Sequence, residues 1–90
     1  MSDEPVLKIS SSEGIIINAR KGDKVVFNAD RIFIKGVKQD ATGGEILFKV
    51  STEFIQKNNE VSSSNGGKAI TEIANGGSAI LRRNIIRNSE

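Results

Sequence analysis

The sequence predicts an all-β domain built from short, stacked strands, and two internal echoes are the main reason. The motif IINA at 16–19 returns ten residues later as VFNA at 26–29. The motif NGGKAI at 65–70 returns, again after ten residues, as NGGSAI at 75–80. A strand of about five residues and a short turn fill a unit of this length. No stretch shows the apolar period of an amphipathic helix, so stacked β units are expected.

Seven short strands are expected along the chain, bounded by turns rich in Gly, Asn, Ser or Asp. They cover residues 6–10, 15–19, 24–29, 32–35, 45–50, 69–74 and 79–82. The turn at 20–23 places Gly22 at the position that needs a positive φ angle. Residues 37–44 and 58–67 are polar and predict loops, and 51–58 fits either a helical turn or a strand.

Both faces of the first strands are apolar, which does not suit a small sheet that meets water on one side. Ile15 and Ile17 point to one face and Ile16 to the other. The same alternation recurs in the strands at 24–29 and 32–35. We therefore expect these strands to be covered by other copies of the chain. A small β-barrel or sandwich, which would cover them within one chain, is the alternative architecture.

Size and composition also favour self-association. The chain is expected to form a single domain over residues 1–90, with flexible ends at 1–5 and 87–90. Domains this small are stabilised by disulfides, metals or oligomerisation. The chain has no Cys and no His, which removes disulfides and the commonest metal ligand and general base. We expect a homo-oligomer with no catalytic residue, no metal and no cofactor.

Four glycines are predicted to be structural turns, namely Gly66, Gly67, Gly76 and Gly77. A phosphate-binding loop would need a Gly-Lys-Ser/Thr ending and a following helix. Lys68 is followed by Ala, and neither repeat meets this requirement. The glycines are therefore assigned to turn geometry.

The C-terminal segment carries a basic cluster, Arg82, Arg83 and Arg87, which is a candidate contact for a partner. All four Phe residues lie upstream, so no aromatic platform stands beside the arginines. The chain has 13 Lys and Arg against 11 Asp and Glu, a weak net charge of +2 that disfavours a dedicated nucleic-acid binder. The alternative function is nevertheless a small phage- or bacteria-encoded binding module that uses this basic C-terminus to contact nucleic acid or an acidic protein.

Residues 14–36, which read GIIINARKGDKVVFNADRIFIKG, resemble the repeats of central spike proteins of contractile phage tails and of type VI secretion tips. The resemblance implies an intertwined trimeric β-helix, with apolar side chains of three chains packed on the threefold axis. It further implies a structural subunit of a phage tail or baseplate spike, with other tail or secretion-device proteins as partners. The chain lacks the His-x-His pair that binds iron at some spike apices, so no metal is implied.

The location expected from this resemblance is the virion, as part of a phage tail, and the cytoplasm is the alternative. No apolar run exceeds three residues, so no transmembrane helix is expected. The first residues, MSDE, are acidic and no apolar stretch follows them. This pattern argues against a secretory signal peptide.

Overall fold

Strands make up nearly all of the described chain. The computed structural model describes residues 5–89. The strands are β1 (Val6–Arg20), β2 (Lys24–Thr42), β3 (Glu45–Lys57), β4 (Glu60–Ser64), β5 (Lys68–Ile73), β6 (Ser78–Arg82) and β7 (Ile85–Asn88). There is no helix within these residues, and the predicted all-β class is confirmed.

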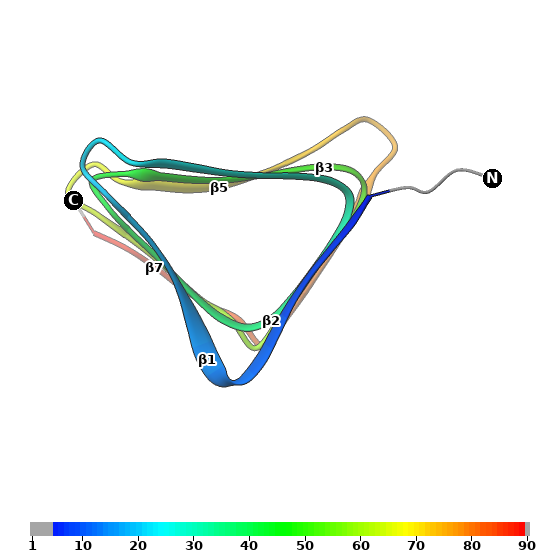
Figure 1. Cartoon of the computed structure of the whole chain (residues 1–90), viewed down its shortest axis with the longest axis horizontal. Coiled ribbons are helices and arrows are strands. Elements are labelled where there is room, and N and C mark those ends of the chain that lie inside the picture. The colour runs from blue at the N-terminus through cyan, green and yellow to red at the C-terminus, as the bar shows by residue number, and fades with distance from the viewer. Residues whose placement is uncertain (1–4, 90) are drawn as a thin grey trace.

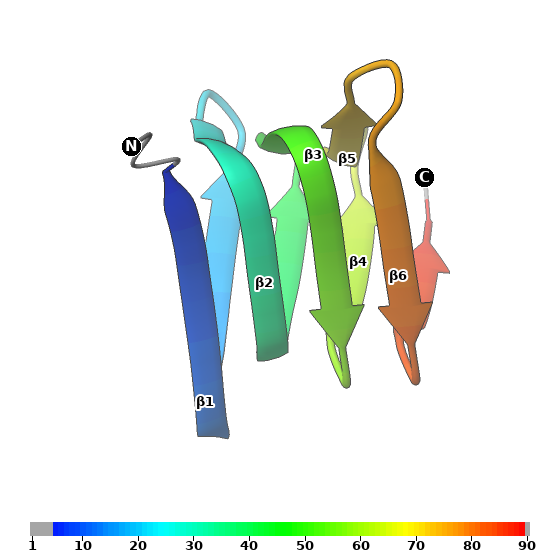
Figure 2. The same cartoon turned by 90° about the vertical axis from the view of Figure 1, so that its right-hand side faces the viewer.

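The strands coil into a parallel solenoid of about four turns with a triangular cross-section (Figures 1 and 2). Every strand pairs in parallel with the strand one turn away. The turns differ in length, because the turn from Ile9 to its partner Ile34 is longer than the turn from Val25 to Ile46. β1, β2 and β3 are long because β1 and β3 each continue round one corner of the triangle and β2 continues round two, with a shift of register at some of these corners.

The three sides of the triangle are named A, B and C. Side A stacks residues 6–10, 31–35, 53–57 and 78–82. Side B stacks residues 15–20, 37–42, 60–64 and 85–88. Side C stacks residues 24–29, 45–50 and 68–73. One chain forms all three sides and encloses its own core, whereas the spike resemblance implies that three chains share the triangle.

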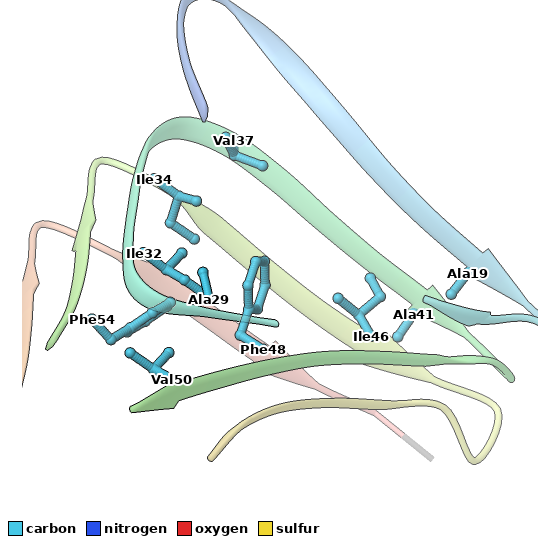
Figure 3. Close-up of a cluster of buried hydrophobic side chains, with 10 residues drawn as sticks. All are labelled: Ala19, Ala29, Ile32, Ile34, Val37, Ala41, Ile46, Phe48, Val50 and Phe54. Carbon is cyan, nitrogen blue, oxygen red and sulfur yellow. The ribbon is translucent and has the colours of Figure 1, made fainter. Parts of the chain in front are cut away.

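The core fills the solenoid axis with side chains from all three sides (Figure 3). Ile32 and Ile34 from side A and Phe48 from side C are at most 1% exposed. The ring of Phe48 stacks on that of Phe27 in the preceding turn, with centroids 4.9 Å apart, and lies 5.6 Å from that of Phe54. Each turn thus covers the inward side chains of the turn before it.

The ten-residue echoes correspond to sides of the triangle and not to its turns. Asn18 lies on side B and Asn28 on side C of the same turn, while the partner of Asn18 one turn later is Asp40. The motifs at 65–67 and 75–77 likewise form successive corners of one turn. The four glycines therefore mark two different corners of one turn and not the same corner in successive turns. Neither NGG motif closes a hairpin. The motif at 65–67 joins β4, which pairs with β2 and β7, to β5, and the motif at 75–77 joins β5 to β6, which pair with different parts of β3.

Two stretches that were predicted to be polar loops are strands. Residues 37–42 form the side B part of β2, and 60–64 form β4. The ambiguous stretch at 51–57 lies in β3. Inward polar residues such as Gln39, which is buried, interrupt the alternation of apolar and polar residues that predicts a strand. A solenoid strand is hydrogen-bonded on both edges and packed on its inner face, and this context outweighs weak β propensity.

The ends of the chain were expected to be flexible. Residues 87 and 88 belong to β7. The carbonyl of Pro5 accepts hydrogen bonds from the N–H groups of Asp30 and Arg31, at 3.1 and 3.3 Å. The expectation for residues 1–4 and 90 falls outside the described residues.

Candidate functional site

The corner between sides A and B, here called the A–B corner, has a left-handed residue in successive turns. Gly36, Asn58 and Arg83 occupy it with φ angles of 69°, 55° and 55°. Gly is unstrained in this region and Asn is tolerated there. An arginine lacks both advantages, and holding it there costs about 1 kcal/mol or more. A strained residue of this kind is a reason to look for a function of its side chain.

Two stacked asparagines clamp the A–B corner. Nδ2 of Asn59 donates to the Ile34 carbonyl at 3.1 Å, and its Oδ1 accepts from the Val37 N–H at 2.6 Å. Asn84 repeats the arrangement one turn later. Its Nδ2 donates to the Gln56 carbonyl at 3.1 Å, and its Oδ1 accepts from the Asn59 N–H at 3.0 Å. Each side-chain amide satisfies two backbone groups of the preceding turn, so the corners are held in line.

Three cationic side chains form a row immediately before this corner. Lys35, Lys57 and Arg82 are register partners on side A, in β2, β3 and β6. Neighbouring strands place their backbones about 4.8 Å apart along the solenoid axis. Together with Asn58 and Arg83 they line a shallow depression of about 210 Å³. We call Lys35, Lys57, Arg82 and Arg83 the basic row.

No carboxylate neutralises the basic row. None of its four side chains has an ion-pair partner among the described residues. Glu13 and Glu60 line an adjoining depression at the start of side B, which shares Asn58 with that of the basic row. Side C shows the opposite arrangement, because Lys24, Glu45 and Lys68 alternate in sign along one register position. Like charges in neighbouring strands repel, so the basic row destabilises the chain when no anion is bound.

The structure separates the three arginines that sequence analysis had grouped. Arg82 and Arg83 belong to the basic row, whereas Arg87 lies in β7 on side B. Lys35 and Lys57, which complete the row, had not been singled out. Lys35 and Lys57 are far from Arg82 in the sequence, and only the stacking of successive turns brings the three side chains together.

A repeat at the length of one full turn is the signal that could have found them. The motif KNN at 57–59 returns as RRN at 82–84, and KGV at 35–37 occupies the equivalent place one turn earlier. Turns of unequal length blur this repeat, because the step from Lys35 to Lys57 is shorter than the step from Lys57 to Arg82. The shorter ten-residue echo was therefore the more visible pattern.

The glycines predicted to be turns lie at two other corners. Gly66 and Gly76 have φ angles of 80° and 85°, as tight turns require. Gly67 is needed for a different reason, because a Cβ atom there would overlap the carbonyl of Ala41 in the turn before. Gly77 is similarly crowded. All four therefore have structural explanations.

A second feature is the open C-terminal end of the solenoid. Leu81 and Ile86 point toward the axis, yet they are 58% and 62% exposed because the described chain adds no further turn. With Phe54 and Ile73 they help to line a depression of about 310 Å³. Side C has three strands where sides A and B have four, so the depression lies beside an incomplete side.

Within residues 5–89 there is no helix of the length and apolar character that crossing a bilayer requires. The same residues contain no group of three or more acidic side chains placed to hold a metal ion. Comparison of the chain with protein-family models, curated proteins and solved structures finds no match. The two features described above, the basic row and the open end, therefore carry the functional argument.

Proposed function

We propose that the chain is a structural, non-enzymatic subunit that assembles with copies of itself through the ends of its solenoid. The open C-terminal end is the observation that carries this proposal. Covering Leu81 and Ile86, each more than half exposed, would contribute about 1 kcal/mol or more per side chain. We propose that the first turn of a second copy, which has the same triangular outline, covers these side chains.

Unpaired strand edges at both ends support stacking. The first turn presents the edges of 6–10, 15–20 and 24–29, and the last strands present those of 68–73, 78–82 and 85–88. Each of these segments is paired along one edge only, within the described residues. Free edges recruit strands from other chains. A second copy offers the same triangular outline and the same strand direction, so it would continue the parallel pairing directly on sides A and B.

Stacking of this kind is head to tail. The C-terminal end of one copy meets the N-terminal end of the next, so the contact does not close on itself and copies add indefinitely. Side C is one strand shorter within the described residues, so the depression lined by Leu81 and Ile86 would face the first turn of the neighbouring copy.

A lateral contact would account for a trimer, the state that the spike resemblance implies. Val26, Leu47 and Ile70 share one register position on the outside of side C. Val26 and Ile70 are exposed. We propose this apolar row as the surface through which solenoids associate side by side. It corresponds to the outer apolar faces that first suggested self-association.

The place of such an assembly in a phage tail, a baseplate spike or a type VI secretion tip is a proposal that rests on the resemblance of residues 14–36. Other tail or secretion-device proteins would then be its partners, and the virion its location. A rod with a solvent-excluded core and hydrogen bonds parallel to its axis suits a component that bears load along that axis. Proteomic analysis of purified particles tests this part of the proposal.

Light scattering coupled to size-exclusion chromatography tests assembly itself. We expect masses that are multiples of 9.7 kDa and that rise with protein concentration. A constant mass of 9.7 kDa throughout the micromolar range would contradict the proposal.

Two matched isoleucines sharpen this test. Ile86 faces the axis at the open end, while Ile16 points outward from side B, and they are 62% and 64% exposed. We expect Ile86→Lys to reduce the assembled fraction strongly and Ile16→Lys, whose side chain points away from the axis, to reduce it less. Equal effects would show that general surface hydrophobicity, rather than end stacking, drives association. Circular dichroism checks that both variants keep their strands.

A further inference from the structure

We propose that the basic row binds the phosphate groups of a linear polyanion whose chain runs along the solenoid axis. This site is formed by outward side chains at the A–B corner and shares only β6 with the strand edges proposed for self-assembly, so binding of an anion does not require stacking. The sequence disfavoured a nucleic-acid partner because the net charge is only +2. The structure concentrates four positive side chains at one corner, and local field rather than net charge decides where an anion binds.

The geometry of the row suits a ligand with several charges in a line. Lys35, Lys57 and Arg82 follow one another on adjacent strands, about 4.8 Å apart. The clamp formed by Asn59 and Asn84 holds the corner in register, so the backbone positions that carry the charges are fixed before a ligand arrives. A preorganised site loses less conformational entropy on binding.

The side chains present match phosphate. Arg82 contributes a planar guanidinium that can hold a phosphate through two hydrogen bonds, and the lysines act as point charges beside it. Carboxylates on one face of an extended acidic peptide recur about every 6.6 Å, which is out of step with the row. A phosphate chain carries charge at every unit of a flexible backbone and can follow the shorter spacing. Inorganic polyphosphate and single-stranded nucleic acid share this chemistry.

The conformation of Arg83 is the second observation that favours a ligand. The equivalent positions in the two preceding turns are Gly36 and Asn58, which the left-handed conformation suits. Arg83 brings a fourth positive charge to the depression at the expense of backbone strain and of repulsion from Arg82 and Lys57. Both costs are offset when an anion occupies the depression.

Base stacking is not part of the proposal. Phe33 is the outward aromatic residue of side A, and Nζ of Lys8 lies 5.8 Å from the centre of its ring. The other three Phe residues, at positions 27, 48 and 54, point inward. Any nucleic acid would therefore be held through its phosphates, with little dependence on its sequence.

Fluorescence anisotropy tests the site with two labelled probes, inorganic polyphosphate and a mixed-sequence single-stranded oligonucleotide of about 12 nucleotides. The unchanged chain should bind at about 50 mM salt and more weakly as salt rises. Arg83→Asn should weaken binding about three- to tenfold. For the oligonucleotide it should also reduce the slope of log K against log salt by about 0.7. The probe that binds more tightly identifies the source of the phosphate.

Two control variants each remove one positive charge outside the basic row. Arg87→Gln changes a residue of side B, and Lys68→Gln changes a residue of the alternating row on side C. Both should change the affinity less than twofold, and Lys57→Gln should resemble Arg83→Asn. Absence of binding by both probes at low salt would overturn the proposal, as would equal losses in all four variants. Equally strong competition by polyglutamate of the same total charge would show a carboxylate site instead.

Discussion

The second and fourth turns of side A occupy equivalent register positions and differ in what covers them. Ile34 in the second turn is 0% exposed, and Leu81 in the fourth turn is 58% exposed. Both point toward the axis, and the side A segment of β3, residues 53–57, lies between them. A side chain in the solenoid is therefore buried by the turns on both sides of it and not by its own hydrophobicity. An aliphatic side chain of similar size therefore contributes more to the free energy of unfolding in the middle of the stack than at its end.

The largest expected effect is the truncation of a core side chain in the middle of the stack. Phe48→Ala removes a ring that contacts Phe27 and Phe54, and should lower the free energy of unfolding by about 3–5 kcal/mol. Leu81→Ala at the open end should cost less than about 1 kcal/mol in the monomer, since that side chain is mostly solvated. Chemical denaturation at low protein concentration measures both. Equal losses would mean that the end of the stack is covered in solution.

The asparagine clamp should show the same gradient at a smaller scale. Asn59 is 1% exposed, and Asn59→Ala leaves the Val37 N–H and the Ile34 carbonyl without their partners. We expect a loss of about 2–4 kcal/mol. Asn84→Ala, at a partly buried position, should cost about half as much. Thermal or urea unfolding would contradict the gradient if the fourth-turn variant were the less stable of the two.

The two NGG corners provide a comparison in which no difference is expected. Gly66 and Gly76 have similar positive φ angles, and a Cβ atom at either position would meet no atom within 4 Å. Gly66→Val and Gly76→Val should therefore each cost about 1–3 kcal/mol, from backbone strain alone. Denaturation midpoints that differ by more than experimental error would show that one corner makes contacts in solution that the other lacks.

Local patterns in the sequence were sufficient for the all-β class and for most strands. Residues 45–50 form the strand that was predicted there, and its alternating residues Ile46, Phe48 and Val50 share the inward face. The ten-residue echo is visible in the sequence, but its structural interpretation depends on which segments stack. Because successive turns differ in length, the sequence shows no constant period from which the stacking partners could be assigned. The strand at 37–42 was missed because tertiary pairing, rather than local propensity, stabilises it.

The candidate site depended on stacking even more strongly. Arg82 and Arg83 were identified as neighbours in the chain, and Lys35 and Lys57 join them only because successive turns are superimposed. The strain at Arg83 is a property of the corner and is not visible as a motif. Residues that meet through long-range parallel pairing are the ones that a search for local motifs overlooks.

The smallest expected effect separates the roles of the corner residue in the third and fourth turns. Arg83→Asn gives the fourth turn the same corner residue as the third turn, where Asn58 stands. Asparagine tolerates a left-handed backbone, and the substitution also removes a repelling charge. We expect the free energy of unfolding to rise by about 0.5–1 kcal/mol, while affinity for a phosphate chain falls. Stability and binding would then move in opposite directions, which unfolding of the variant could not produce. Denaturation and anisotropy on the same preparation measure the pair, and a variant that loses stability together with binding would show that Arg83 is retained for packing rather than for a ligand.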